Sequence, residues 1–185
     1  MPSAFDLIDI PNSALRENIS MPTPPVQLRS FQPADAAAFR ELNQAWIERY
    51  FGMEQPDHEV LDDPIGHILE PGGHIFMACV EQRVIGCCGL IVVQPGVYEV
   101  AKMAVAEEYR GRGVGRKLLV YVIEQARALG ATLLTLATND KLANAVHLYE
   151  SLGFRHLPPE PSPYARANVF MDFSLVEKHD RELHG

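Results

Sequence analysis

Three apolar runs in the middle of the chain are separated by turns of only a few residues. They span residues 74–80, 83–93 and 97–105, and the second turn contains Pro95-Gly96. Turns this short join strands that reverse direction, so the runs predict an antiparallel meander. A further short strand is expected at residues 26–29.

The period of the apolar residues changes after Gly113. Apolar side chains then recur every three or four positions, which predicts the buried face of a long helix. The residues of this face are Val114, Leu118, Val122, Ala126 and Leu129. Gly130 follows directly and is placed to end the helix, because glycine adopts the left-handed conformation of helix ends without strain.

The remaining apolar patterns complete a mixed set of elements. Helices are expected at residues 33–50, 59–69 and 142–151, and strands at 133–138 and 169–175. The order of helices and strands predicts a single α/β domain. Its central sheet is expected to be mixed and mostly antiparallel, with about six to seven strands flanked by helices.

Prolines separate the first part of the chain from this domain. They interrupt residues 1–25, where they prevent a long helix. We therefore expect a flexible N-terminal arm over residues 1–25, the folded domain over 26–176 and a C-terminal tail over 177–185. Residues 1–10 carry acidic side chains and no basic region of the kind that opens a secretory signal, so we expect a cytoplasmic protein.

The composition argues against several classes of protein. The formal net charge is −8, whereas nonspecific nucleic-acid binding requires a basic face. No apolar run approaches the roughly 18 residues that a membrane span requires. Cys79, Cys87 and Cys88 have no CxxC spacing, and the histidines form no metal-binding pattern. We expect no nucleic-acid partner, no membrane segment and no metal.

A glycine-rich segment joins the last strand of the meander to the long helix. Gly111, Gly113 and Gly115 let the main chain turn tightly and approach a ligand without a Cβ atom in the way. The start of the helix then presents unpaired N–H groups and the positive end of its dipole. The segment therefore predicts a site for an anion such as a phosphate.

Two common phosphate-binding motifs do not fit this segment. A P-loop read from Gly111 requires a glycine where Arg116 stands, and so does the dinucleotide fingerprint GxGxxG. The strands before the segment also form a meander instead of a βαβ unit. A dinucleotide-binding oxidoreductase is therefore much less favoured.

The residues Arg110-x-x-Gly113-x-Gly115 match the Q/R-x-x-G-x-G/A motif of the GNAT family of N-acetyltransferases. Asn144 and the run from Leu148 to Phe154, which contains Tyr149, are similar to the second signature of that family. The resemblance covers residues 26–176. It implies a GNAT-like fold whose fourth and fifth strands splay apart. It also implies direct transfer of an acetyl group from acetyl-CoA to a primary amine in a ternary complex, with no metal.

The resemblance also assigns roles to particular residues. The end of the fourth strand would pair with the pantetheine arm, and the main chain after it would bind the pyrophosphate. These cofactor-binding residues are Met103, Ala104, Val105, Arg110, Gly111, Arg112, Gly113, Val114, Gly115, Arg116 and Asn144. Tyr149 corresponds to the general acid that protonates the departing thiolate. Glu99 is the candidate base or substrate anchor, and pairing of Glu99 with Lys102 or another cation is the alternative.

The sequence leaves the acceptor amine open. Tyr50, Phe51, Tyr164 and Arg166 are candidates for an aromatic pocket with a carboxylate clamp. A clamp at Arg166 would favour an amino acid, whereas an acidic rim would favour a polyamine or a peptide amine. We expect a small-molecule or peptide amine as partner and allow for a homodimer. The alternative function is a non-catalytic acyl-CoA-binding regulatory module.

Overall fold

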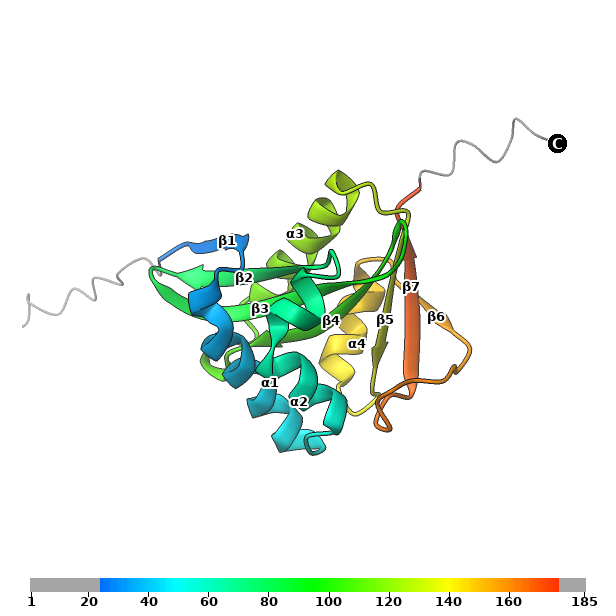
Figure 1. Ribbon diagram of the computed structural model, residues 1–185, viewed down its shortest axis with the longest axis horizontal. Helices are drawn as coiled ribbons and strands as arrows, with labels where there is room; N and C mark the ends of the chain where they lie inside the picture. The colour runs from blue at the N-terminus through cyan, green and yellow to red at the C-terminus, as the bar shows by residue number, and fades with distance from the viewer. Residues whose placement is uncertain (1–23, 177–185) are drawn as a thin grey trace, which may run out of the picture.

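The computed structural model describes residues 24–176 and builds them around one seven-stranded sheet (Figure 1). The strands are β1 (Val26–Ser30), β2 (His74–Val80), β3 (Arg83–Gln94), β4 (Val97–Val105), β5 (Leu133–Thr138), β6 (Arg155–Leu157) and β7 (Val169–Ser174). They lie in the order β1-β2-β3-β4-β5-β7-β6, and every neighbouring pair is antiparallel except β4 and β5. The predicted mixed, mostly antiparallel α/β sheet is therefore confirmed.

The predicted strands occupy nearly the same residues in the structure. β2, β3 and β4 form the expected meander, and β5 covers residues 133–138. β6 has no counterpart among the predicted ranges, because a strand of three residues is too short to show a period of two. The arm and tail predicted for residues 1–25 and 177–185 lie outside the described residues, apart from residues 24 and 25.

The helices are α1 (Ala36–Tyr50), α2 (Gln55–Asp62), α3 (Val114–Ala128) and α4 (Ala143–Ser151), with short turns η1 (Pro33–Asp35), η2 (Ile65–Leu69) and η3 (Glu107–Tyr109). The single helix predicted for residues 59–69 is wrong in its bounds. Helix α2 begins earlier, because Glu54 and Asp57 form a reciprocal capping box around its first turn. Pro64 then separates α2 from η2, since proline lacks the N–H that a continuing helix requires.

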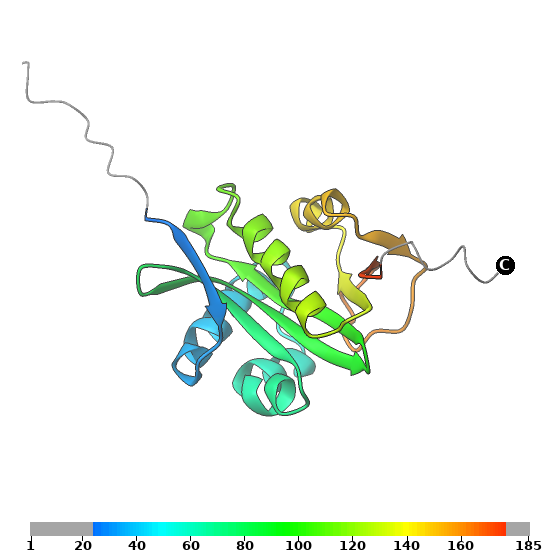
Figure 2. The same ribbon diagram turned by 90° about the horizontal axis from the view of Figure 1, so that it is seen from above.

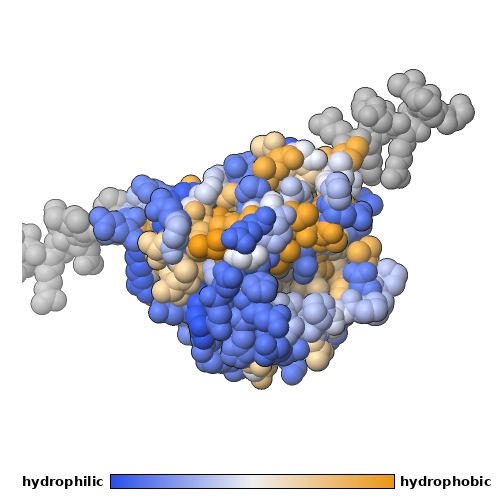
Figure 3. Space-filling view, viewed as in Figure 1, coloured by the Kyte–Doolittle hydropathy of each residue, from blue (hydrophilic) through white to orange (hydrophobic). Residues whose placement is uncertain are grey.

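Helices cover both faces of the sheet, with α3 and α4 on one face and α1 and α2 on the other (Figure 2). The buried residues of the predicted α3 face are Val114, Leu118, Val122 and Ala126. Full burial of each valine or leucine contributes about 1.5–3 kcal/mol. The prediction is wrong for Leu129, which is 42% exposed because it follows the last turn of α3. Hydrophilic residues cover the outer surface where Figure 1 places α1 and α2 (Figure 3).

Strands β4 and β5 pair over only part of their length. Their parallel register joins residues 97–99 to residues 133–135, and β4 continues to Val105 without pairing to β5. On its other side β4 carries a bulge, because Lys102 and Met103 together oppose Cys88 of β3. Lys102 has a φ of 51°, in the left-handed region. The splayed strands that the family resemblance implied are therefore present, and they open a gap in the middle of the sheet.

Candidate active site

A cavity of about 640 Å³ lies where β4 and β5 diverge. Its walls come from β4, the glycine-rich segment, the first turns of α4, the end of α1 and the loop before β7. This volume lies within the usual range for small-molecule and cofactor sites. Residues predicted to bind the donor and residues predicted to bind the acceptor therefore share one cavity.

The glycine-rich segment forms one end of the cavity. Gly111 and Gly113 have φ values of 72° and 77°, which side chains rarely adopt, and a Cβ atom on either would meet nothing within 4 Å. The main-chain N–H groups of residues 111–116 have no partner within the described part of the chain. Gly115 lies deeper, where a Cβ atom would be 3.6 Å from both Leu148 and Met103. The segment thus presents free donors beside open space.

The basic side chains of this segment have other contacts. Arg110 lines the cavity, but its Nε donates to the Val105 carbonyl at 3.0 Å. Arg112 lies over the Tyr109 ring, and Arg116 donates to the Ser151 hydroxyl at 2.6 Å. Neither Arg112 nor Arg116 is among the residues that line the cavity. In this structure the main chain, and not the side chain of Arg112 or Arg116, faces the predicted phosphate position.

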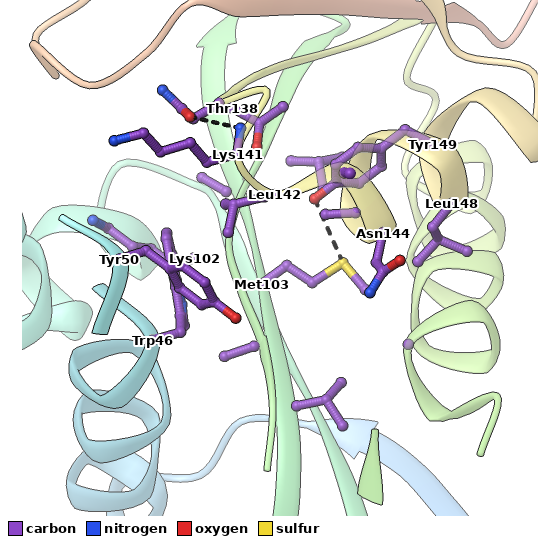
Figure 4. Close-up of a pocket in the computed structure, with 18 of the residues that line it drawn as sticks. Trp46, Tyr50, Lys102, Met103, Thr138, Lys141, Leu142, Asn144, Leu148 and Tyr149 are labelled. Atoms are coloured by element: carbon purple, nitrogen blue, oxygen red, sulfur yellow. Dashed lines mark hydrogen bonds between the residues drawn. The ribbon is translucent and has the colours of Figure 1, made fainter. Parts of the chain in front are cut away.

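Tyr149 of α4 and Met103 of β4 point toward one another across the gap between the two elements (Figure 4). The Tyr149 hydroxyl lies 3.9 Å from the Met103 sulfur, which is a weak acceptor. Burial raises the pKa of Tyr149, so the hydroxyl keeps its proton. Asn144 lies on the first turn of α4, exposed and on the cavity wall. The Tyr149 hydroxyl therefore has a proton available for a better acceptor.

Glu99 lies on β4 and lines the cavity. Its carboxylate makes no ion pair or hydrogen bond with any of the described residues, so the alternative pairing with Lys102 is not formed. Burial raises the pKa of Glu99, the ammonium of Lys102 opposes this shift, and the carboxylate of Glu160 adds to it. Glu99 is therefore a desolvated carboxylate that holds a proton more readily than an exposed one.

Lys102 pairs instead with Asp57 of α2. Its Nζ lies 2.6 Å from Asp57 Oδ1, and the two side chains are 4% and 0% exposed. Arg166 binds the same carboxylate through two nitrogens, at 2.6 and 2.7 Å, and also donates to Glu54 at 2.9 Å. Burial alone would raise the pKa of Asp57, but the hydrogen bonds from Arg166 and Lys102 outweigh it and lower the pKa to about 2. We call Glu54, Asp57, Lys102 and Arg166 the ion network.

Comparison with known proteins identifies the family. The sequence matches the model described as the Acetyltransferase (GNAT) family over residues 37–154, which is more than half of the chain. The chain belongs to the GNAT family. It is 28% identical over 148 residues to an uncharacterized N-acetyltransferase of Escherichia coli, YjgM, covering 76% of this chain and 87% of that protein. The family assignment makes the protein an acetyl-CoA-dependent N-acetyltransferase.

Solved structures agree with the GNAT fold. A GNAT-family acetyltransferase of Staphylococcus aureus Mu50 is similar with a TM-score of 0.74 and 24% identity, covering 82% of this chain and 100% of that one. The PaiA N-acetyltransferase of Thermoplasma acidophilum, solved in complex with coenzyme A, is similar with a TM-score of 0.67 and 14% identity. That comparison covers 81% of this chain and 99% of that one. At these identities the likeness concerns the fold.

The aromatic end of the cavity in this GNAT enzyme contains the residues that the sequence suggested for the acceptor. Tyr50, Phe51, Tyr164 and Arg166 all line the cavity, and Trp46 joins them. Arg166 is not the free carboxylate clamp that we considered, because its guanidinium already binds two carboxylates.

Sequence reasoning missed the carboxylates of the ion network, since residues 54–57 were not assigned to a helix. The run Glu54-Gln55-Pro56-Asp57 carried a usable signal, because acidic residues three apart around a proline are typical of a helix start.

Metal sites, membrane-spanning helices and reactive thiols each require particular side chains among the described residues of the GNAT enzyme. Within residues 24–176, no set of three or more His, Cys, Asp or Glu side chains could hold a metal ion. In the same part of the chain, no helix has the length and apolar character to cross a membrane. Cys87 is fully buried, and burial raises its pKa to about 12, so its thiol is inert.

Proposed function

We propose that acetyl-CoA lies along the glycine-rich segment and β4, and that the acceptor amine enters from the aromatic end of the same cavity. One observation carries this arrangement. Glu99 and Tyr149 line a single cavity whose far end presents the unpaired N–H groups of residues 111–116. An anion at one end would therefore find N–H donors, and an amine at the other end would find a carboxylate that can accept its proton.

The residues of the donor end fit a CoA pyrophosphate. Main-chain N–H groups at a helix start are already oriented, and the positive φ of Gly111 and Gly113 keeps them turned into open space. Met103, Ala104 and Val105 would receive the pantetheine arm, since β5 pairs with residues 97–99 of β4 and diverges from the rest of that strand. When bound, acetyl-CoA supplies a thioester whose acetyl group is open to attack by an amine. A main-chain N–H near Met103 would polarise the thioester carbonyl.

Glu99 is the proposed base. An amine is largely protonated at neutral pH and must lose a proton before its nitrogen can attack a carbonyl carbon. The Glu99 carboxylate lines the cavity without a partner among the described residues, so it is free to bind the ammonium group. Its raised pKa makes it a stronger base than an exposed glutamate.

Tyr149 is the proposed acid. Its hydroxyl keeps its proton because burial raises its pKa, and its present partner is the weakly accepting sulfur of Met103. A thiolate leaving from CoA is a much better acceptor than a thioether. Asn144, one helical turn before Leu148 on α4, is proposed to contact the pantetheine arm from the same wall.

The direct test is acetyl-CoA consumption by the full chain over a panel of amines, amino acids, polyamines and peptide N-termini. Thermal-shift titration with acetyl-CoA and with NADH runs beside it, because specific binding stabilises a protein by mass action. We expect stabilisation by acetyl-CoA alone and turnover with at least one amine. Stabilisation by NADH would contradict the donor assignment.

A cytoplasmic location and a homodimer stay proposals that rest on the sequence. Cell fractionation and size-exclusion chromatography with light scattering test them directly.

A further inference from the structure

The acceptor end of the cavity contains cations that are already neutralised. Lys102 and Arg166 line the wall, and Asp57 and Glu54 bind them from the side away from the cavity. The network holds two positive and two negative charges, so its formal sum is zero. The buried side chain of Asp57 is the centre of the network, since it contacts both cations.

Aromatic rings hold Arg166 in this arrangement. Its guanidinium carbon lies 4.6 Å from the centre of the Tyr164 ring and 5.9 Å from the rings of Trp46 and Phe51. Lys102 Nζ lies 4.7 Å from the same Tyr164 ring. Turning either cation toward a ligand would break these contacts and remove one of the two ion-pair partners of the buried Asp57 carboxylate, which is unfavourable.

Two further cations, Arg110 and Lys141, line the cavity. Arg110 belongs to the donor end and is bound to the Val105 carbonyl. Lys141 is exposed at the rim, with its Nζ 5.8 Å from the centre of the Phe51 ring. Lys141 has no ion-pair partner among the described residues, but water surrounds it at the rim, whereas Glu99 is the desolvated charge at this end that no described side chain pairs with.

We propose that Asp57 sets the acceptor class, so that the pocket accepts amines on an apolar or aromatic group and discriminates against amines that carry a neighbouring carboxylate. The amine of either kind of acceptor is received by Glu99 and by the faces of the rings. The carboxylate of an amino acid would have to lose its water without gaining an unbalanced cation among the buried side chains of the wall. This inference rests on the proposed function and names the substrate class of the same site.

Matched pairs of acceptors test the inference on the unaltered protein. Tryptamine with tryptophan, and phenethylamine with phenylalanine, differ in each case only by the carboxylate. We expect kcat/KM for the amine to exceed that for the amino acid by at least about tenfold. Equal or better turnover of the amino acid overturns the inference and leaves the proposed function intact. Absence of turnover with every amine, despite acetyl-CoA binding, contradicts the proposed function instead.

The variant Asp57→Asn tests the role of the buried carboxylate. Asparagine keeps the size and the acceptor oxygen but leaves the network with one excess positive charge beside the cavity. We expect the amine-to-amino-acid ratio of kcat/KM to fall by about tenfold, because a carboxylate then gains an ionic partner. Asp62→Asn is the matched control, since Asp62 lies on the same helix and pairs with the exposed Arg40. Its ratio should stay that of the unaltered protein.

A second variant covers the case in which Asp57→Asn does not fold. Glu54→Gln removes one negative charge from the same network at a side chain that is 25% exposed. It should lower the ratio in the same direction. If either variant folds and binds acetyl-CoA while the ratio stays unchanged, Asp57 does not set the acceptor class.

Discussion

Lys102 reaches Asp57 from a left-handed residue of β4: its φ is 51°, and its Nζ lies 2.6 Å from Asp57 Oδ1. Such a backbone conformation costs a non-glycine residue about 1 kcal/mol. Lys102 belongs to both the ion pair and the bulge. Through Asp57, α2 therefore contacts β4 at the residue where its regular pairing with β3 is interrupted. The ion network and the gap between β4 and β5 are therefore coupled through one residue.

Replacing Asp57 should lower the free energy of unfolding, and the loss should be largest above about pH 4. The folded-state pKa of Asp57 is about 2, against 3.8 for the unperturbed group. A lowered pKa contributes stability above the unfolded value, about 2 kcal/mol here, and this contribution is lost as the pH falls from about 4 to about 2. Urea unfolding of Asp57→Asn should show at least this loss near neutral pH and a flatter dependence below pH 4. Asp62→Asn should show neither change.

Glu99→Gln should separate activity from stability. Loss of the base should lower kcat by about 10²–10⁴-fold. The free energy of unfolding should stay the same or rise, because the substitution removes a desolvated carboxylate without an ion-pair partner among the described residues. Steady-state kinetics and urea unfolding on the same sample check both. A full kcat together with unchanged stability would remove Glu99 from the mechanism.

The pH dependence of the rate should identify the group that accepts the proton. Because the pKa of Glu99 is raised, kcat/KM should increase with pH through a value above that of an ordinary glutamate. The negative charge of Glu160 is one cause of the raised pKa of Glu99, so Glu160→Gln should move the increase of kcat/KM to lower pH. If the rise of kcat/KM with pH stays at the same pH in Glu160→Gln and is still present in Glu99→Gln, the group that accepts the proton is not Glu99.

Tyr149→Phe should distinguish an enzyme from a binding module. The ring and its edge contact with Phe154, 5.7 Å between centres, are kept, and only the hydroxyl is lost. We expect kcat to fall by about 10²-fold or more while the affinity for CoA, measured by calorimetry, stays unchanged. A protein that only binds acyl-CoA has no turnover to lose, and the unaltered chain would then be inactive in the same assay.

Gly113→Ala should weaken donor binding through the backbone alone. Gly113 has a φ of 77° with open space around it, so alanine adds strain of about 1 kcal/mol and no clash. Gly130→Ala is the matched control, since Gly130 has a φ of 78°, equally open space, and a place outside the cavity wall. Both variants should lose similar stability in urea, and only Gly113→Ala should raise the KM for acetyl-CoA.

The sequence was sufficient for the elements that repeat a local pattern. The meander and α3 follow from apolar spacing. The turn with positive φ before α3 follows from Gly111 and Gly113, because glycine adopts this conformation without strain. The ion network was not predictable in this way. Asp57 and Arg166 are 109 positions apart, and nothing local shows that they meet. The carboxylate clamp considered for Arg166 was wrong for that reason, because its guanidinium is already bound by Asp57, which lies on a helix distant in the sequence.

That separation also has a consequence for how the molecule is made. The Asp57 carboxylate leaves the ribosome long before Arg166, so it can pair with at most one of its two cations until the loop before β7 has docked. Contacts between distant residues form late, because closing a long loop costs conformational entropy. The glycine-rich end of the cavity can form while synthesis is still in progress, whereas the aromatic end is completed only by nearly the last residues of the folded domain.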